Sequence, residues 1–375
     1  MIYFDNAATS GRKPKAVETA VTSAVKLCAN PGRSGHKLSL SCAATVQNAR
    51  YALNALFDGY GFDRVVFTKN CTEALNIALF GVLKKGDHVV ASCMEHNSVL
   101  RVLEKLKNEK VITYDVCPLD KTGKISPSRI KSLLKKQTRL VAVSCASNVN
   151  GSIPDIAKIK QALPTHILLL CDGAQAGGHF PVSMQKLGID LLALAGHKGL
   201  LGIQGSGALL FSERVDPVPI LYGGTGSMSI SLEMPNFYPD ALEAGTLSFP
   251  AVSALLEGVR FVEKRIEKIG AHTRMLTEYF LENLQAINGY KAYSIANPCG
   301  IVAFGLKNVQ SEYLASVLSA RYDIATRGGL HCAPLMHEAL STLNDGLLRV
   351  SFSLFNQTHE IDELLLALQE IAMEN

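Results

Sequence analysis

Short apolar runs that end in polar or glycine residues alternate with longer amphipathic stretches through the first two thirds of the chain. This alternation is typical of strand–helix–strand units around a parallel sheet. The predicted strands are Arg64–Thr68, His88–Ser92, Val111–Tyr114, Leu140–Ser144, His166–Cys171, Leu191–Leu194 and Ala208–Phe211. The predicted helices are Pro14–Leu27, Ala43–Phe57, Thr72–Leu83, Ser98–Asn108, Pro127–Lys135 and Pro154–Leu163. We therefore expect an α/β domain with a mostly parallel sheet.

The pattern changes after Gly245. A helical stretch is followed by two strand-like segments and a C-terminal helix with one apolar stripe. These elements are Ala251–Ile269 continuing into His272–Ile287, Gly300–Leu306, Leu347–Phe352 and His359–Met373. We expect residues 14–247 to form a large domain, and residues 1–13 with 248–375 to form a smaller α+β domain that touches it closely.

Composition narrows the class of protein. Hydrophobic residues make up 47% of 375 residues, which is enough to fill two cores. The net charge is only +4 and no basic run occurs, so we expect neither a nucleic-acid-binding surface nor a polybasic membrane-binding patch. No apolar run approaches the roughly 18 to 20 residues that span a bilayer, and the N-terminus lacks a signal core. We expect a soluble, unexported protein that acts on small molecules.

The cysteines indicate a reducing compartment. Nine of them are scattered singly without a Cys-x-x-Cys pair, in a chain too large to need disulfides. Reduced thiols and a cytoplasmic location are therefore expected. Cys93 and His96 have a spacing that zinc ligands use, but no second ligand pair follows, so we expect no metal site.

Polar residues follow four of the predicted strands. They are Asp172–Gln175, Gly196–Lys198, Met94–Asn97 and Ser147–Asn148. Ligands of open α/β sheets bind at the carboxyl ends of strands, so these are the places for chemistry. Taken singly, each has an ordinary interpretation: a helix cap, a solvated lysine, a loop histidine or a turn former.

Taken together, these segments resemble a known family. Asp-Gly-x-Gln at Asp172–Gln175, followed about two dozen residues later by Gly-His-Lys at Gly196–Lys198, is similar to the fold-type I, class V aminotransferase-like enzymes. The resemblance implies that Lys198 binds pyridoxal 5′-phosphate as a Schiff base. Asp172 would keep the pyridine nitrogen protonated, because a nearby carboxylate favours the charged form.

The resemblance assigns further cofactor contacts. Gln175 and Asn148 would lie at the phenolate edge, and His96 would stack on the ring and help to move protons. Cys71 and Thr72 follow a strand and open a helix, a position that suits a phosphate. His197 would be a third phosphate contact. The segment Glu243–Thr246 resembles the loop whose threonine, here Thr246, reaches the phosphate of the partner subunit, which implies a homodimer.

The segment Ala325–Pro334 resembles the active-site loop of group II cysteine desulfurases. Such enzymes convert L-cysteine to alanine and leave a persulfide, here on Cys332, for transfer to an acceptor protein in processes such as iron–sulfur cluster assembly. The ordinary alternative is a loop thiol. An arginine and a histidine within five residues of Cys332 are expected to lower its pKa.

Three other segments match the substrate loops of the same family. Tyr3–Thr9 contains Asn6 and Ala7, and Asn30–His36 contains His36. Leu348–Ser353 contains Arg349, which would grip the substrate carboxylate by planar bidentate pairing. Arg327 is the next candidate for that role.

The sequence departs from the family at three positions. Ala195 replaces a serine before Gly-His-Lys, Cys71 replaces a serine or threonine, and Leu330 replaces a histidine near the cysteine. These changes are expected to affect cofactor retention and sulfur transfer. Selenocysteine lyase, or another class V lyase or transaminase, is therefore the alternative activity, and a non-catalytic cofactor-binding scaffold is disfavoured.

Overall fold

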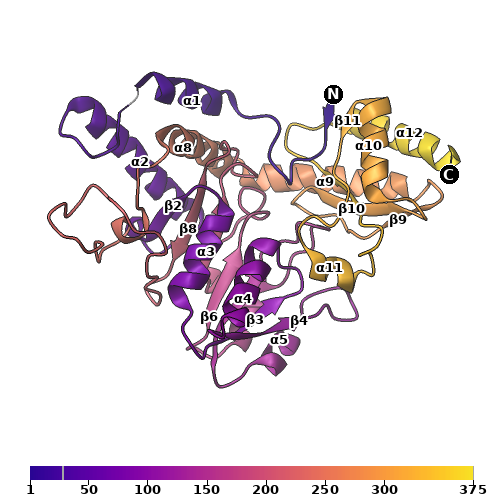
Figure 1. Cartoon of the computed structure of the whole chain (residues 1–375). Helices are drawn as coiled ribbons and strands as arrows, with labels where there is room; N and C mark the ends of the chain where they lie inside the picture. The colour runs from indigo at the N-terminus through magenta and orange to yellow at the C-terminus, as the bar shows by residue number, and fades with distance from the viewer. Residues whose placement is uncertain (28, 375) are drawn as a thin grey trace.

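A seven-stranded sheet forms the centre of the larger part of the molecule (Figure 1). We describe the protein from a computed structural model, which covers residues 1–27 and 29–374; Cys28 lies outside the described residues. The strand order is β2-β8-β7-β6-β5-β3-β4. Their bounds are β2 Val65–Thr68, β3 His88–Ser92, β4 Thr113–Cys117, β5 Thr138–Ser144, β6 Leu168–Asp172, β7 Leu191–Ala195 and β8 Gly207–Phe211.

The strand directions bring most carboxyl ends to one edge. Strands β4, β3, β5, β6 and β7 pair in parallel. Strand β8 runs antiparallel to both of its neighbours, so β2 points the same way as the parallel strands. The predicted mostly parallel α/β sheet is thus confirmed. Loops after β2, β3, β5, β6 and β7 consequently meet at the same edge.

Alternate residues along each strand supply the two faces of this sheet. Val90, Val141 and Leu169 share one core with α2, α6 and α8, whereas Val89, Leu140 and Leu168 share the other with α3 and α4. Both faces are covered by helices, which explains the nearly continuous apolar strands. The helix bounds are α1 Lys15–Leu27, α2 Lys37–Leu56, α3 Cys71–Val82, α4 Asn97–Asn108, α5 Pro127–Leu133, α6 Ile156–Ala162, α7 Met184–Leu187 and α8 Phe249–Glu263.

A third apolar core joins the C-terminal elements to the N-terminal segment. An antiparallel sheet of order β12-β10-β9 packs with α9, α10 and α12. Strand β1 pairs in parallel with β11, which places the start of the chain beside its C-terminal part (Figure 1). The bounds are β1 Ile2–Tyr3, α9 Ile266–Leu284, β9 Tyr290–Ala292, β10 Ile301–Leu306, α10 Ser311–Tyr322, β11 Ile324–Ala325, α11 Pro334–Ala339, β12 Leu348–Ser351 and α12 Thr358–Glu374.

The division into residues 14–247 and the remainder stays a proposal. Helix α8 falls in the smaller part under that division, yet it packs against α1 and α2 and contributes Leu255 and Val259 to a core of the large sheet. The two parts are therefore joined through α8 as well as through the N-terminal segment.

The structure corrects several predicted elements. Helix α2 starts at Lys37 instead of Ala43, because the Nδ1 atom of His36 accepts a hydrogen bond from the Ser39 amide and caps it. Strand β4 begins at Thr113, two residues later than predicted. Helices α8 and α9 are separate and not one continuous helical stretch, because the backbone of Arg265 is not helical. Helices α7, α10 and α11 and the short strands β1, β9 and β11 had not been predicted.

Candidate active site

A cavity of about 100 Å³ opens where the loops after the parallel strands meet. Its walls come from the ends of β5, β6 and β7, the start of α3 and the loop before α4. The lining residues are Asn70, Cys71, Thr72, His96, Ser98, Ser144, Ala146, Asn148, Asp172, Ala174, Gln175, Ala195, His197 and Lys198. The structure thus gathers the predicted cofactor residues in one pocket, apart from Thr246.

Lys198 and Asp172 carry the charge of this pocket. Burial lowers the pKa of Lys198, and the Asp172 carboxylate opposes that shift. Asp172 lies at the end of β6, where its Oδ1 atom accepts hydrogen bonds from the Ala174 amide (2.9 Å) and the Cys71 thiol (3.5 Å). No hydrogen bond from a described residue reaches its Oδ2 atom. One oxygen is fixed by the protein, and the other remains available to a ligand.

His96 precedes α4 and caps it. Its Nδ1 atom accepts a hydrogen bond from the Ser98 amide at 3.1 Å, and burial lowers the pKa of the imidazole. The neutral ring therefore carries its proton on Nε2, which remains a donor. This arrangement suits stacking and hydrogen-bond donation, whereas the predicted proton transfer by His96 stays a prediction.

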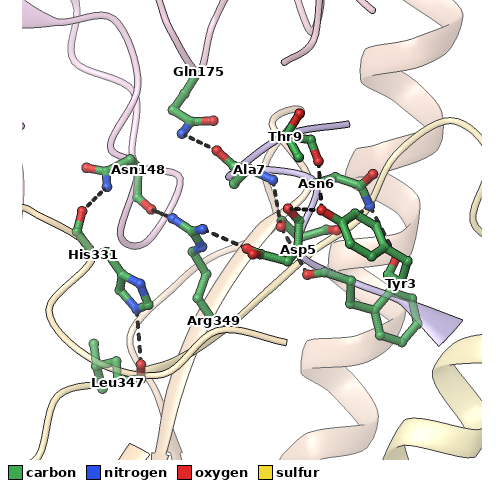
Figure 2. A network of polar contacts seen from close by, with 12 residues as sticks. Tyr3, Asp5, Asn6, Ala7, Thr9, Asn148, Gln175, His331, Leu347 and Arg349 are labelled. Atoms are coloured by element: carbon green, nitrogen blue, oxygen red, sulfur yellow. Dashed lines mark hydrogen bonds and ion pairs between the residues drawn. The ribbon is translucent and has the colours of Figure 1, made fainter. Parts of the chain in front are cut away.

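Gln175 connects the pocket to the start of the chain. Its Nε2 atom donates to the Ala7 carbonyl oxygen at 3.1 Å (Figure 2). Its buried Oε1 atom has no hydrogen-bond partner among the described residues. A buried acceptor without a partner is costly, so this side chain is suited to a ligand that brings a donor or an ordered water.

The start of α3 faces the pocket, as predicted for a phosphate site. The first amides of a helix have no intrahelical acceptor, and they line the cavity at Cys71 and Thr72. The thiol of Cys71 points instead to Asp172, and burial raises its pKa well above the ordinary value. Any phosphate contact from Cys71 must therefore use its backbone amide rather than its side chain.

His197 lies beside the lysine and contacts the N-terminal segment. Its Nδ1 atom is 3.1 Å from the Thr9 hydroxyl oxygen, and burial lowers the pKa of its ring to about 4. The hydroxyl group of Thr9 and the backbone amide of Ser10 also donate to the His197 carbonyl oxygen. The residue before Lys198 is thus held in place by a segment nearly 190 positions away.

The loop that carries Cys332 is fastened to the rim of the pocket. The Asn148 side chain donates to the His331 carbonyl oxygen at 2.7 Å (Figure 2), and the Asn97 amide donates to the Cys332 carbonyl oxygen at 2.7 Å. Of the cysteines in the described part of the chain, Cys332 is the one that is exposed. Asn148 therefore positions this loop, a role that had not been predicted.

The sequence interpretation of the charge near Cys332 needs correction. His331 is buried, its Nε2 atom lies 3.0 Å from the Leu347 carbonyl oxygen, and burial lowers its pKa well below the ordinary value. It is neutral and adds no positive charge. The positive groups of this region are Arg327 and Arg349, whose charges oppose protonation of His331.

Arg349 is fully buried on β12 and fastened on two sides. Its Nη1 atom donates to the Asn148 carbonyl oxygen at 2.8 Å, and its Nη2 atom forms an ion pair with Asp5 at 2.9 Å (Figure 2). The Nε atom has no partner among residues 1–27 and 29–374. Arg327 forms a backbone bridge with Arg349, and its guanidinium makes no hydrogen bond or ion pair within the described chain.

The remaining predicted residues lie outside the pocket. Asn6 donates to the Ser351 carbonyl oxygen and Ala7 donates to the Ser351 hydroxyl, so both fasten the N-terminal segment to β12. His36 caps α2 and is exposed. Thr246 is exposed and borders a separate cavity. Within one chain, none of these side chains lines the pocket of Lys198.

Glu95 was not singled out from the sequence, although it lies next to His96. It is completely buried and accepts hydrogen bonds from the Ser92 hydroxyl, the Ser144 amide and the Ser144 hydroxyl. Burial raises its pKa to about 7. Glu95 therefore ties the end of β3 to the end of β5. The sequence feature that could have indicated Glu95 is its position three residues after the end of a buried strand, next to His96.

The sequence matches the family described as aminotransferase class-V over residues 2–364. The chain belongs to the class-V aminotransferase family. A probable cysteine desulfurase of Methanothermobacter thermautotrophicus is 33% identical, with 99% of this chain and 94% of the relative covered. A cysteine desulfurase of Serratia proteamaculans is 31% identical over 99% of this chain and 93% of the relative.

Solved structures of class-V relatives agree with the fold. The apo structure of a cysteine desulfurase from Thermococcus onnurineus has a TM-score of 0.92 and 29% identity, covering 100% of this chain and 95% of the other. The predicted family and fold class are therefore confirmed.

Neither membrane spans nor metal clusters are found in this class-V chain, as far as it is described. No helix in residues 1–27 and 29–374 is long and apolar enough to cross a bilayer. The same residues contain no group of three or more His, Cys, Asp or Glu side chains placed to hold a metal ion.

Proposed function

We propose that this protein is a pyridoxal-phosphate-dependent cysteine desulfurase, which converts L-cysteine to L-alanine and leaves a persulfide on Cys332. The observation that carries the proposal is the pairing of Lys198 and Asp172 in one pocket with an exposed cysteine loop fastened to its rim. The names of the full-length relatives support the choice of substrate.

The residues of the pocket fit this cofactor. The free Oδ2 atom of Asp172 matches a protonated pyridine nitrogen, and the unpaired Oε1 atom and spare amide hydrogen of Gln175 match a polar ring substituent. The start of α3 matches a phosphate group. When bound through a Schiff base, pyridoxal phosphate withdraws electrons from the bonds at the α-carbon of an amino acid.

Side chains of the protein can bind the substrate carboxylate, accept the α-proton and remove the sulfur. Arg349 and Arg327 supply the positive charge that binds the substrate carboxylate. Because burial lowers its pKa, the Nζ atom of Lys198 can lose its proton and then accept the α-proton of the substrate. The Sγ atom of Cys332 attacks the sulfur of the substrate, the carbon–sulfur bond breaks, and the products are alanine and the Cys332 persulfide. Exposure of Cys332 suits transfer of this sulfur to an acceptor protein.

The test is a Cys332→Ala variant, with Cys299→Ala as a matched control because Cys299 is buried in the same part of the molecule. Cys332→Ala should keep the absorption band of the bound cofactor and still respond spectrally to L-cysteine, but form no persulfide and little alanine. Alanine production at the wild-type rate would rule out the desulfurase. Assays with L-selenocysteine identify the alternative lyase, because selenium is a better leaving group and can depart without the thiol.

We also propose a homodimer in which each chain completes the site of the other. The irregular segment 217–238 exposes large apolar side chains, among them Ile230 at 100% and Leu232 at 105% of full exposure. Contiguous exposed apolar residues indicate a protein contact. Arg33 donates to the carbonyl oxygens of Gly224 and Gly245, so the loops with His36 and Thr246 lie on the same face.

Sedimentation tests this arrangement. Ile230→Asp together with Leu232→Asp should shift the protein toward monomers and weaken cofactor retention, since Thr246 would no longer reach a partner's phosphate. A Leu366→Asp variant is the control, because the Leu366 side chain is exposed on α12. A stable wild-type monomer with bound cofactor and full activity would exclude the shared site.

A further inference from the structure

The ion pair between Asp5 and Arg349 is not explained by the function proposed above. Arg349 is the residue expected to bind the substrate carboxylate, yet a carboxylate of the chain itself already contacts its Nη2 atom at 2.9 Å (Figure 2). We propose that Asp5 stands in for the substrate carboxylate at Arg349 and is displaced when an amino acid binds. This inference rests on the proposed function, because it presumes a carboxylate-bearing substrate.

The guanidinium of Arg349 has hydrogen-bonding capacity that the described part of the protein does not use. A substrate carboxylate binds most strongly when two parallel N–H groups donate to its two oxygens. Asp5 accepts from Nη2 through Oδ1 alone, Nη1 donates to Asn148, and Nε is buried without a partner in the described structure. The N–H groups of Nε and Nη2 can therefore donate together to the two oxygens of a ligand carboxylate. In the described structure Asp5 occupies Nη2 and leaves Nε unused.

The exposure of the two partners makes the exchange asymmetric. The side chain of Arg349 is 2% exposed and that of Asp5 is 22% exposed. A buried cation without a counter-charge is strongly unfavourable, so Arg349 needs a carboxylate whether or not substrate is present. Asp5 can return to water when it is displaced, whereas Arg349 cannot. The pair therefore supplies Arg349 with a counter-charge in the empty site, and displacing Asp5 uses part of the binding free energy of the substrate carboxylate.

The backbone around Asp5 does not depend on this ion pair. Asn6 and Ala7 are bonded to Ser351 on β12, and Ala7 also accepts a hydrogen bond from Gln175. A change at the Asp5 side chain should therefore leave the N-terminal segment in place. Asp5→Asn removes the charge and retains an oxygen that can accept from Nη2, and Asp5→Ser is a second variant that removes the contact.

The experiment compares two ligands that differ only in a carboxylate. Holoenzyme is titrated with L-alanine and with ethylamine, and binding is followed by the change in cofactor absorbance. In Asp5→Asn and Asp5→Ser, the dissociation constant of L-alanine should fall about tenfold, while that of ethylamine changes by less than about twofold. L-alanine should also raise the melting temperature of the variants more than that of the wild type. Asp323→Asn, which removes an exposed aspartate paired with the N-terminus, is the control.

Two results would overturn the inference. An unchanged or weaker affinity for L-alanine would mean that Asp5 orients Arg349 and does not compete with substrate. An equal change for both ligands would place the effect at the amine or the cofactor. Neither ligand contains sulfur, so a failure of the desulfurase proposal would appear separately, as wild-type enzyme that forms no persulfide on Cys332 from L-cysteine.

Discussion

The two sides of the candidate site are built in different ways. The large-sheet side comprises Cys71, His96, Asp172 and Lys198, each of which follows or ends its own strand of a single sheet. The small-sheet side comprises Asp5, Arg327, Cys332 and Arg349, which come from opposite ends of the chain; Asp5 and Arg327 both pair with residues of β12. Strand geometry positions the first set, whereas hydrogen bonds between distant segments position the second.

This difference has a consequence for function. The residues of the large-sheet side are anchored in a sheet whose two faces are both packed against helices. The substrate side depends on a few specific contacts, among them Asn148 with the His331 carbonyl oxygen and Asp5 with Arg349. We therefore expect substitution of Lys198 on the large-sheet side to abolish all chemistry, and substitutions of Asp5 and Arg349 on the small-sheet side to change substrate affinity in a graded way. Substitution of Cys332 should remove sulfur transfer alone.

The largest effect is expected at Lys198. Lys198→Ala should lose the absorption band of the covalently bound cofactor and all turnover, because no other described side chain in the pocket can both hold the cofactor and accept the α-proton. Absorbance spectra and alanine release measure the two losses. Lys13→Ala is the control, since Lys13 contacts the His197 carbonyl oxygen without lining the pocket. Turnover in Lys198→Ala would mean that substitution on the large-sheet side does not abolish chemistry, and the expected difference between the two sides would be wrong.

The same difference explains what the sequence could predict. The positions of Asp172, His96 and Lys198 followed from apolar runs that end in polar residues, and the strand directions then brought them together. The resemblance to a family identified Arg349 and Cys332, but periodicity carries no information on which segments meet. The ion pair of Asp5 with Arg349 joins residues 344 positions apart. The neutral state of His331 likewise results from tertiary burial, which the neighbouring residue types do not reveal.

A smaller and graded effect is expected at Arg349. Arg349→Lys keeps the charge but cannot contact Asn148 and a carboxylate with the same planar fork. A charge-assisted hydrogen bond contributes about 1.5 to 3 kcal/mol, so kcat/KM for L-cysteine should fall roughly ten- to a hundred-fold. Arg321→Lys, at an exposed pair with Glu374, is the control and should leave the kinetics unchanged. An unaltered kcat/KM in Arg349→Lys would assign the carboxylate to Arg327.

The smallest effect concerns the stability of the large-sheet side. The pKa of Glu95 is about 7 in the folded protein, because burial opposes its charge, and returns to about 4.5 on unfolding. The folded state therefore binds a proton that the unfolded state releases between these values. The bound proton therefore stabilises the folded state fully below about pH 4.5, and this contribution to the free energy of unfolding is lost as the pH rises through 7. One pKa unit corresponds to 1.36 kcal/mol, so the loss should approach roughly 3 kcal/mol.

Glu95→Gln should remove this pH dependence and keep the contacts, since its carbonyl oxygen can accept from Ser92 and Ser144 and its amide can donate to the Ser144 hydroxyl. Urea unfolding of the cofactor-free protein between pH 5 and 8 provides the measurement. Wild type should lose stability relative to Glu95→Gln as the pH rises, whereas Glu18→Gln, at an exposed position on α1, should follow wild type. Parallel pH curves for wild type and Glu95→Gln would mean that Glu95 is charged when folded. The network joining β3 to β5 would then be held by an ionised carboxylate, and Ser92 and Ser144 would be indispensable to it because their hydrogen bonds would alone offset the buried charge.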